Sequence, residues 1–539
     1  MRPRLRADVR SSPDHRVLAD AAADRPGALS EEERRVYEPE IAFIRCAADS
    51  AEQRFQRLRA ARVTLLGSGP VPAALLEAGL RSGWRRVVVR AGGDDLAGLR
   101  AVARAATRDS AQEVAFDAEL ALAGTDLLLC VSDRREDLIA AARACARSGV
   151  ATGQVLVGRD EVWVTEVGPA DRVAADSCWR RLDARRGGEG LLTGSACGVI
   201  ASRLALSCFT HLTGVSGDAG EPVVTRIDLR DLRAHGHRPR PYLVSGDIRP
   251  RAEVDVAAFA ERIGRYVDER VGVLRRLTGD GLPQAPLAVC RASVSDPESA
   301  LPAGTPAPVV TGWGGDRDEA RWRAALAGLA TYASLVDPGG ERVDLLTGHT
   351  CAVTAVDARS PYHAPVGVAA GRSWGDAVAA GLRAHCEALV AGRVETGRPC
   401  DLATAVREVG DERAGELLRL LWAEGVDVGV VDLGGVLGVP AFSLRVAGAT
   451  ITACATTAAE ALRDAVERAV LHWQCGLPVD VTRWVAEPGR SEPADDPRCH
   501  ALVAALRRAG RTLVAVPLVV DDDVRDLAPC LVRVEVGGD

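Results

Sequence analysis

Two glycines near residue 67 have the spacing most suggestive of chemistry in this sequence. The segment VTLLGSGPVPAALL places Gly67 and Gly69 between an apolar strand-like run and a helix-like run. In a Rossmann-type unit, a nucleotide phosphate binds at such a turn, against the start of the helix. However, the third glycine of a GxGxxG fingerprint falls on Pro72, and Arg90 ends the second strand, where an acid would hold the ribose. The turn fits either a phosphate loop or a tight connection without ligand, and the incomplete fingerprint favours the connection.

Missing residue types exclude several other chemistries. The sequence has no lysine and no asparagine, so all 67 basic residues are arginine. This excludes a lysine Schiff base, a phosphate-loop lysine and a Lys/Asn pair that grips a nucleotide. None of the 14 cysteines forms a CxxC pair, which argues against a four-thiolate zinc site and favours reduced, mostly buried thiols. Without a GxSxG elbow, no hydrolase triad is assigned.

The composition is that of a globular protein. The 539 residues are 47% hydrophobic and 26% charged, and their net charge of −7 argues against nucleic acid as a partner. No apolar run approaches the ~20 residues that cross a bilayer, which argues against a membrane partner. We find no signal peptide and expect a cytoplasmic protein.

The elements that position these residues fall into an arm and two α/β units. Residues 1–60 are expected to form an N-terminal arm, mostly helical from Ser30, where Glu33 completes a capping box. Residues 61–220 alternate strand-like and helix-like runs at the spacing of a parallel, doubly wound sheet. Strands are predicted from Arg62, at 85–89 and at 125–133, and further strands follow before a long apolar helix at 190–215.

Residues 221–255 are predicted to be a linker that contains one strand. Its stretch HGHRPRPYL carries His235 and His237, which could be metal ligands or polar linker residues. We favour the linker, because no acidic or cysteine partner is close in the sequence.

Residues 256–539 are predicted to form the second α/β unit. Helices are expected at 256–277, 317–335, 373–391, 412–424, 457–474 and 498–509, and strands at 426–433, 442–448 and 531–536. The segment 487–498 is predicted to be a loop, and the acidic run 519–526 a solvated turn. In the helix at 317–335, Trp322, Leu326, Leu329 and Ala333 form a stripe that is more typical of core than of a binding face.

The first half resembles the E1-like (ubiquitin-activating, ThiF-type) proteins of azole-forming peptide clusters. The likeness rests on the ordered motifs VTLLGSGPV, TDLLLCVSD, GPADRVAADSCWRRLDAR and ACGVIASRLALSCFTHLTGV, and on the lead-in RRVYEPEIAFIRCAADSAEQRFQRLRAARV. These relatives are usually described as leader-peptide-binding proteins in the maturation of thiazole/oxazole-modified microcins, bacteriocins and thiopeptides. The resemblance therefore implies a Rossmann-type domain and a peptide partner.

Three departures from that family change the expectation. Adenylating relatives grip ATP with a set that includes Asn and Lys, which this chain lacks, so adenylation is not expected. Cys178 stands alone where a zinc-binding relative would carry a second cysteine. The start MRPRLRADV matches the family, yet only about twenty residues separate Val9 from Ser30, and a winged-helix peptide-recognition element needs ~40 or more.

The second half resembles YcaO-type cyclodehydratases over roughly residues 255–539. The likeness rests on TGWGGDRDEARWRAALAGLATYASLV, PVGVAAGRSWGDAVAAGLRAHCEALVAGR and TAAEALRDAVERAVLHWQC, taken in that order. In the family, ExxE carboxylates on such helices bind magnesium. Here Ala384 takes the place of the first glutamate of that pair, and only Glu387 and Glu467 remain as candidates.

Two magnesium ions on a triphosphate need several oxygen ligands, and the carboxylates also offset the charge of the ions. Two glutamates are too few, so the unit is predicted to be a degenerate YcaO-like domain without its chemistry. The alternative to a ligand role for Glu387 and Glu467 is an exposed or Arg-paired helix surface.

Together the resemblances imply a non-catalytic scaffold or activator subunit of an azoline-forming cyclodehydratase. It would present a ribosomal precursor peptide to a separate, ATP-dependent YcaO enzyme, without a cofactor of its own, and a homodimer is compatible with this role. One alternative is an ATP- and Mg-dependent enzyme whose atypical site uses Gly67, Gly69, Glu387 and Glu467. Another is a peptide-binding adaptor for a different tailoring enzyme, such as a dehydratase.

Overall fold

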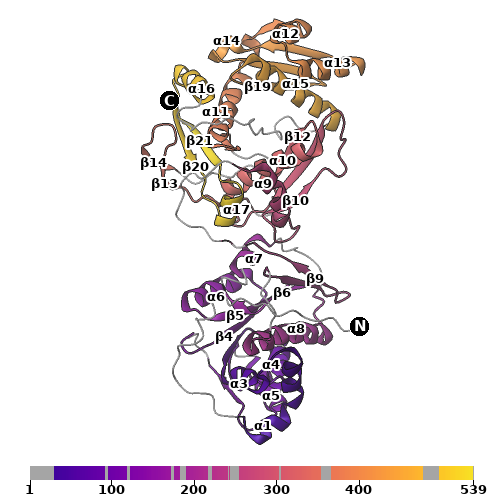
Figure 1. Cartoon of the computed structure of the whole chain (residues 1–539), viewed down its shortest axis with the longest axis vertical. Helices are drawn as coiled ribbons and strands as arrows, with labels where there is room; N and C mark the ends of the chain where they lie inside the picture. The colour runs from indigo at the N-terminus through magenta and orange to yellow at the C-terminus, as the bar shows by residue number, and fades with distance from the viewer. Residues whose placement is uncertain are drawn as a thin grey trace.

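The computed structural model of the chain has two lobes that follow each other in sequence (Figure 1). It describes residues 29–91, 95–117, 122–170, 175–182, 190–215, 221–240, 242, 254–302, 305–353, 366–476 and 497–537. We call the part up to residue 242 the N-terminal lobe and the part from residue 254 the C-terminal lobe. The segment expected to be too short for a winged helix, and most of the loop at 487–498, lie outside the described residues.

The N-terminal lobe is built on one large sheet. Its strands are β1 (Arg62–Leu66), β2 (Arg86–Arg90), β3 (Glu113–Phe116), β4 (Leu127–Ser132), β5 (Ala151–Val157), β6 (Glu161–Thr165), β7 (Gly168–Pro169), β8 (Val224–Asp228) and β9 (Ala234–His237). The order is β3-β2-β1-β4-β5-β6-β8-β9, with β7 beside β5. Strands β3 to β5 of this path pair in parallel and the rest antiparallel. The predicted parallel, Rossmann-type order is therefore confirmed, and its switch point lies between β1 and β4.

Helices cover both faces of this sheet. They are α1 (Glu31–Val36), α2 (Glu38–Ala47), α3 (Ala51–Ala60), α4 (Pro70–Arg81), α5 (Leu96–Ala106), α6 (Arg135–Ser148), α7 (Ala175–Arg181) and α8 (Gly194–Thr213). Helices α2 to α5 and α8 share one buried cluster, against which Val36 of α1 packs, and α6 and α7 share another. Helices on both faces confirm the doubly wound architecture.

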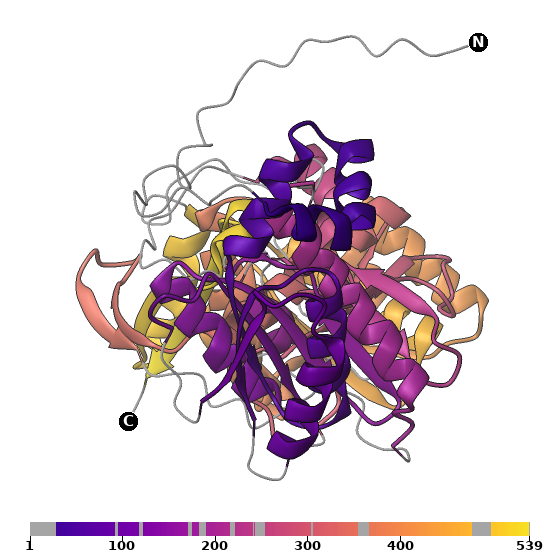
Figure 2. The same ribbon diagram turned by 90° about the horizontal axis from the view of Figure 1, so that it is seen from below.

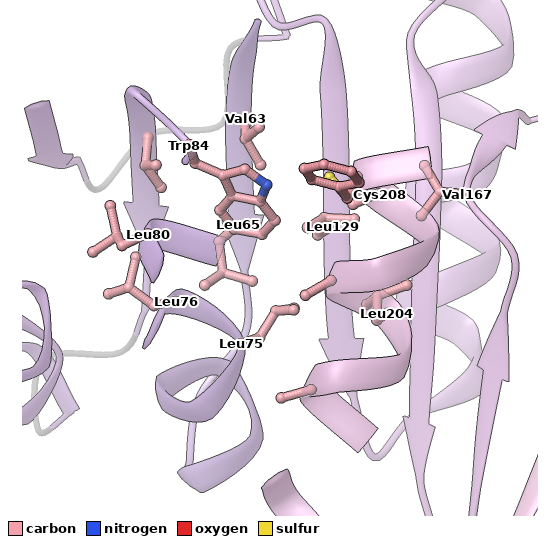
Figure 3. Packing of buried hydrophobic residues seen from close by; sticks show 14 of the residues in the cluster. Val63, Leu65, Leu75, Leu76, Leu80, Trp84, Leu129, Val167, Leu204 and Cys208 are labelled. Atoms are coloured by element: carbon pink, nitrogen blue, oxygen red, sulfur yellow. The ribbon is translucent and has the colours of Figure 1, made fainter. Parts of the chain in front are cut away.

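The main core of the lobe lies between the sheet, α4 and α8 (Figure 3). Figure 3 shows Val63, Leu65 and Leu129 from the strands among Leu75 and Leu76 of α4 and Leu204 and Cys208 of α8. Among the described residues, α8 is long and apolar enough by composition to cross a membrane, which corrects the expectation that no apolar run approaches that length, and half of its most apolar window is buried. The buried residues of α8, among them Ile200 and Leu204, belong to the main cluster of the lobe. Burying one such leucine stabilises a fold by about 1.5–3 kcal/mol.

The expected helical arm is present. Ser30 and Glu33 form the predicted capping box: the Ser30 hydroxyl accepts from the Glu33 N–H, and the Glu33 carboxylate accepts from the Ser30 N–H. Pro39 occupies the first turn of α2, where a missing N–H costs nothing, and so divides α1 from α2.

The described part of the C-terminal lobe contains four antiparallel sheets. Their strands are β10 (Leu274–Thr278), β11 (Ala288–Val294), β12 (Val309–Gly314), β13 (Gly340–Val343), β14 (Thr350–Val353), β15 (Val368–Ala370), β16 (Arg398–Cys400), β17 (Val428–Asp432), β18 (Ala441–Val446), β19 (Ala449–Cys454), β20 (Thr512–Pro517) and β21 (Leu531–Gly537). The sheets are β10-β11-β12, β13-β14, β15-β21-β20 and β16-β17-β18-β19.

Long helices pack on these sheets. The helices are α9 (Val256–Ile263), α10 (Arg317–Val336), α11 (Trp374–Ala391), α12 (Leu402–Val409), α13 (Glu412–Ala423), α14 (Gly434–Leu437), α15 (Ala458–Cys475), α16 (Pro497–Arg508) and α17 (Asp522–Leu527), with short 3-10 turns at Gly264–Tyr266 and Val394–Thr396. The predictions for α10, α11, α13, α15 and α16 are confirmed to within one or two residues. The predicted stripe on α10 is core: Leu326, Leu329 and Ala333 are buried.

Three predictions fail in this region. The helix expected at 256–277 ends at Ile263, and residues 274–278 form β10. His235 and His237 lie in β9 rather than in a linker, and His237 does have an acidic partner, since its Nδ1 lies 2.9 Å from Asp268. The acidic run 519–526 is not a solvated turn, because Asp521 is fully buried and caps α17.

Buried ion pairs join the two lobes, which lie one behind the other in the view from below (Figure 2). Arg181 of α7 donates to the Tyr332 hydroxyl at 2.9 Å and to the Asp521 carboxylate at 3.1 Å. The side chains of Arg181 and Asp521 both have 0% exposure. Arg270 donates to Glu161 across the same junction at 3.0 Å. A charge buried at this depth needs its partner, so these pairs fix one lobe against the other.

Candidate functional site

The glycine turn lies at the switch point of the large sheet, as the fingerprint predicts. Gly67 follows β1 with φ +144°, and Gly69 precedes α4 with φ +90°. A Cβ atom added at Gly67 would lie 2.4 Å from the carbonyl oxygen of Val131. The close approach of β4 therefore requires glycine at position 67 whether or not a ligand binds.

The start of α4 already has an anionic partner from the chain itself. The Gly69 N–H donates to the carboxylate of Asp95 at 2.8 Å. A carboxylate is favourable at a helix N-terminus, which is also where a phosphate would bind. Asp95 thus occupies one of the donors that a nucleotide would use. Sequence spacing does not predict this contact, because the two residues belong to different turns.

Replacing Gly67 with alanine is expected to lower the free energy of unfolding by about 1–3 kcal/mol, because the new methyl group meets the Val131 carbonyl and the backbone conformation is unfavourable. Gly98 in α5 is the matched control, since a Cβ there meets no atom within 4 Å. Gly98→Ala should raise stability by up to about 1 kcal/mol. Urea unfolding followed by circular dichroism measures both. Equal effects of the two changes would contradict the tight-turn interpretation.

A second candidate site is a cavity of about 280 Å³ in the C-terminal lobe. It lies among α10, α11, α13, α15 and α16, far from the glycine turn (Figure 1). Its lining includes five arginines and four acidic side chains: Arg323, Arg383, Arg413, Arg463, Arg498, Glu319, Glu460, Asp464 and Glu467. We call it the arginine cavity.

The two glutamates predicted for magnesium are both paired with arginine. Glu467 accepts from Arg413 Nε at 2.9 Å and from the Trp313 indole at 3.1 Å. Glu387 accepts from both terminal nitrogens of Arg468, at 3.0 and 3.2 Å. The structure thus has the Arg-paired arrangement that the sequence left open as an alternative to ligand binding.

Arg468 is the centre of a network of ion pairs with Glu387 and Asp464. Its second terminal nitrogen also donates to Asp464 at 2.7 Å, and Arg383 lies 3.6 Å from the same carboxylate. Burial alone would lower the pKa of Arg468, but Asp464 and Glu387 outweigh it, and the pKa is raised above its ordinary value. Arg468 therefore remains a fixed positive charge between two carboxylates of neighbouring helices, α11 and α15.

Further pairs line the arginine cavity. Arg323 lies 2.6 Å from Glu319, and Arg463 lies 2.7 Å from Asp411. Arg498 binds the buried Asp376 at 2.8 Å. Burial raises the pKa of Asp376 although Arg498 acts in the opposite direction.

These pairs leave little to bind a magnesium nucleotide. Magnesium needs several oxygen ligands, whereas three of the four lining carboxylates, Glu319, Asp464 and Glu467, already contact guanidinium groups. Over the residues that the structure describes, no group of three or more His, Cys, Asp or Glu side chains is placed to hold a metal ion. The residues of the arginine cavity therefore do not fit a magnesium–triphosphate group.

Sequence reasoning missed most of the arginine cavity. A signal was present on α15, where Glu460, Asp464 and Glu467 follow each other at spacings of four and three residues and so share one helix face. The arginines had no such signal, because they come from four other helices as well as α15. The structure brings Glu387 and Glu467 to neighbouring helices, and it leaves Gly67 and Gly69 in the other lobe.

Comparisons with known proteins agree with this architecture. No protein-family model matches the chain, and no curated protein matches it. Among solved structures, a heterocyclase in complex with substrate and cofactor is similar over 92% of this chain and 83% of its own, with a TM-score of 0.54 and 13% identity. The MccB protein of E. coli is similar over 40% of this chain and 74% of its own, with a TM-score of 0.33 and 13% identity. The chain thus has, over both lobes, a mixed α/β fold similar to that of the heterocyclase.

Proposed function

We propose that this protein is a non-catalytic subunit of an azoline-forming cyclodehydratase in the biosynthesis of a thiazole/oxazole-modified ribosomal peptide. It binds a separate, ATP-dependent YcaO enzyme and presents the precursor peptide to it. The observation that carries the proposal is that the chain's own charged groups occupy both places where a nucleotide would bind. Asp95 caps the glycine turn, and arginines pair with Glu387 and with three of the four carboxylates that line the arginine cavity.

The fold supports the same role. Both lobes keep an intact core, and buried pairs such as Arg181–Asp521 hold them together. A protein that keeps its shape without a nucleotide site can still position a peptide and favour an active state of its partner. Likeness to a heterocyclase structure that contains substrate supports a peptide-modifying system as the setting.

Reconstitution tests this function. The precursor peptide, ATP and magnesium are incubated with the active YcaO enzyme of the same biosynthetic system, with and without this protein, and ring formation is followed as the loss of one water per azoline by mass spectrometry. We expect rings only, or much faster, when both proteins are present. Ring formation by this protein alone would contradict the proposal and favour an enzyme with an atypical ATP site.

A further inference from the structure

Within the residues that the structure describes, β9 at the end of the large sheet has a free edge. In the described part of the sheet, β9 pairs with β8 on one side and ends the strand path on the other. Residues 234–236 are exposed. Figure 1 shows β9 at the side of the N-terminal lobe, close to the junction with the C-terminal lobe. An exposed sheet edge is a template on which an extended chain can add a strand.

The ladder shows which backbone groups remain available on that edge. The Asp228 N–H donates to the Arg233 carbonyl at 3.0 Å, and Ile227 then pairs with Ala234 and Thr225 with Gly236. Since alternate residues of an antiparallel strand direct their N–H and C=O groups to opposite sides, Ala234 and Gly236 direct theirs away from β8. Two residues thus offer one donor and one acceptor each to an added strand.

The free edge is basic, although the chain as a whole carries a charge of −7. The segment RDLRAHGHRPR around it holds four arginines and two histidines against one aspartate. Arg230, Arg233 and Arg238 have exposed side chains, at 66%, 79% and 73%. Their acidic neighbours lie 3.3 to 4.0 Å away, and such exposed pairs contribute little, so these arginines can exchange partners.

One side of the added strand would face the other lobe. Trp163, Arg226 and His235 lie opposite one another on β6, β8 and β9, so they share one face of the sheet. His237 lies on the same face of β9, with its ring 4.9 Å from that of Trp163 and its Nδ1 2.9 Å from Asp268 of the C-terminal lobe. A strand added at β9 would therefore run along the junction of the two lobes.

We propose that β9 binds an extended, acidic peptide segment as an additional strand of the large sheet. Backbone groups of Ala234 and Gly236 supply the hydrogen bonds, and Arg233 and Arg238 select the negative charge. Arginines on an edge also repel the basic strands of other chains and attract acidic ones, so an acidic segment is the kind of strand that this edge favours. This inference rests on the proposed function, because it assigns the edge to the precursor peptide.

A binding experiment with two probe peptides tests the edge. The first is a fluorescently labelled, end-blocked decapeptide that alternates valine or threonine with glutamate, and the second has lysine at every glutamate position. Fluorescence anisotropy with the full-length protein should show saturable binding of the glutamate peptide and at least about tenfold weaker binding of the lysine peptide.

Two matched variants localise the binding. Ala234→Pro removes the outward N–H without removing a hydrogen bond to β8, whereas Ala234→Thr keeps that N–H. The proline variant should bind the glutamate peptide about tenfold more weakly, and the threonine variant should bind like the wild type. Arg233→Glu with Arg238→Glu should reverse the preference between the two peptides, and thermal unfolding confirms that each variant folds.

Binding that is absent, that does not depend on charge, or that survives Ala234→Pro unchanged would overturn the inference. None of these results concerns the complex with the cyclodehydratase, which the reconstitution measures separately. If β9 fails to bind the peptide, the proposed function is therefore still tested by the reconstitution.

Discussion

Replacing Arg468 with methionine is expected to lower the free energy of unfolding by about 3–5 kcal/mol, the range seen when one partner of a buried ion pair is removed. The change leaves Glu387 and Asp464 without the guanidinium that both now contact. Asp464 has 4% exposure and Glu387 17%, so water replaces little of the lost interaction. Urea unfolding of the full-length protein, followed by circular dichroism, measures the loss.

Two control variants separate charge from packing. Arg468→Met combined with Glu387→Gln and Asp464→Asn removes the charges together and should recover most of the loss, since hydrophobic or neutral replacement of a complete pair is often tolerated. Arg34→Met removes an exposed pair with Glu52, at 45% and 49% exposure, and should cost less than about 1 kcal/mol. An Arg468→Met variant as stable as the Arg34→Met variant would show that this network does not hold the helices of the arginine cavity.

Replacing Arg181 with methionine should lower the free energy of unfolding by a similar amount, again about 3–5 kcal/mol. It should also uncouple the unfolding of the two lobes. Arg181 is the fully buried partner of Asp521 and Tyr332 across the junction. Without it, calorimetry should resolve two unfolding transitions, one for each lobe, in place of a more cooperative one. Tyr332→Phe is the milder control, because it removes one hydroxyl and should cost about 1 kcal/mol.

The loss of stability in the Arg181→Met variant, relative to the wild type, should depend on pH. Burial raises the pKa of Asp521 even though Arg181 opposes the shift. A carboxyl group whose pKa is raised in the folded state contributes stability at low pH and loses that contribution as the pH rises through its folded pKa. Removing Arg181 raises this pKa further, so the variant should lose less stability at pH 5 than at pH 8. The opposite trend would show that Asp521 does not titrate as a buried, uncompensated acid.

Periodicity in the sequence predicted the fold well where the elements are long. The apolar spacing of α10 and α15 placed both within one or two residues, and the alternation of strands and helices before residue 160 predicted the parallel sheet. The helix predicted over 256–277 was wrong because Val273, Leu274 and Leu277 have helix-like spacing, although Leu274 and Leu277 belong to the short strand β10 and Val273 directly precedes it. Pairing with β11 decides that this short apolar run forms a strand and not a helix.

The candidate sites were predictable only in part. Gly67 and Gly69 could be placed from their local turn, since a strand and a helix flank them in sequence. The partners of the site residues could not be predicted, because they come from distant segments of the chain. Asp95 contacts Gly69, Arg413 contacts Glu467, and Arg181 contacts Asp521, which lies 340 positions away in the sequence. Charge pairing over such separations leaves no periodic trace in a single sequence.

Calorimetric titration of the purified protein with ATP and magnesium tests whether the protein binds a nucleotide. We expect no saturable heat, because Asp95 occupies the start of α4 and arginines pair with three of the four carboxylates that line the arginine cavity. Saturable micromolar binding that disappears in a Glu467→Gln variant would identify the arginine cavity as a nucleotide site and would rule out a subunit without nucleotide binding.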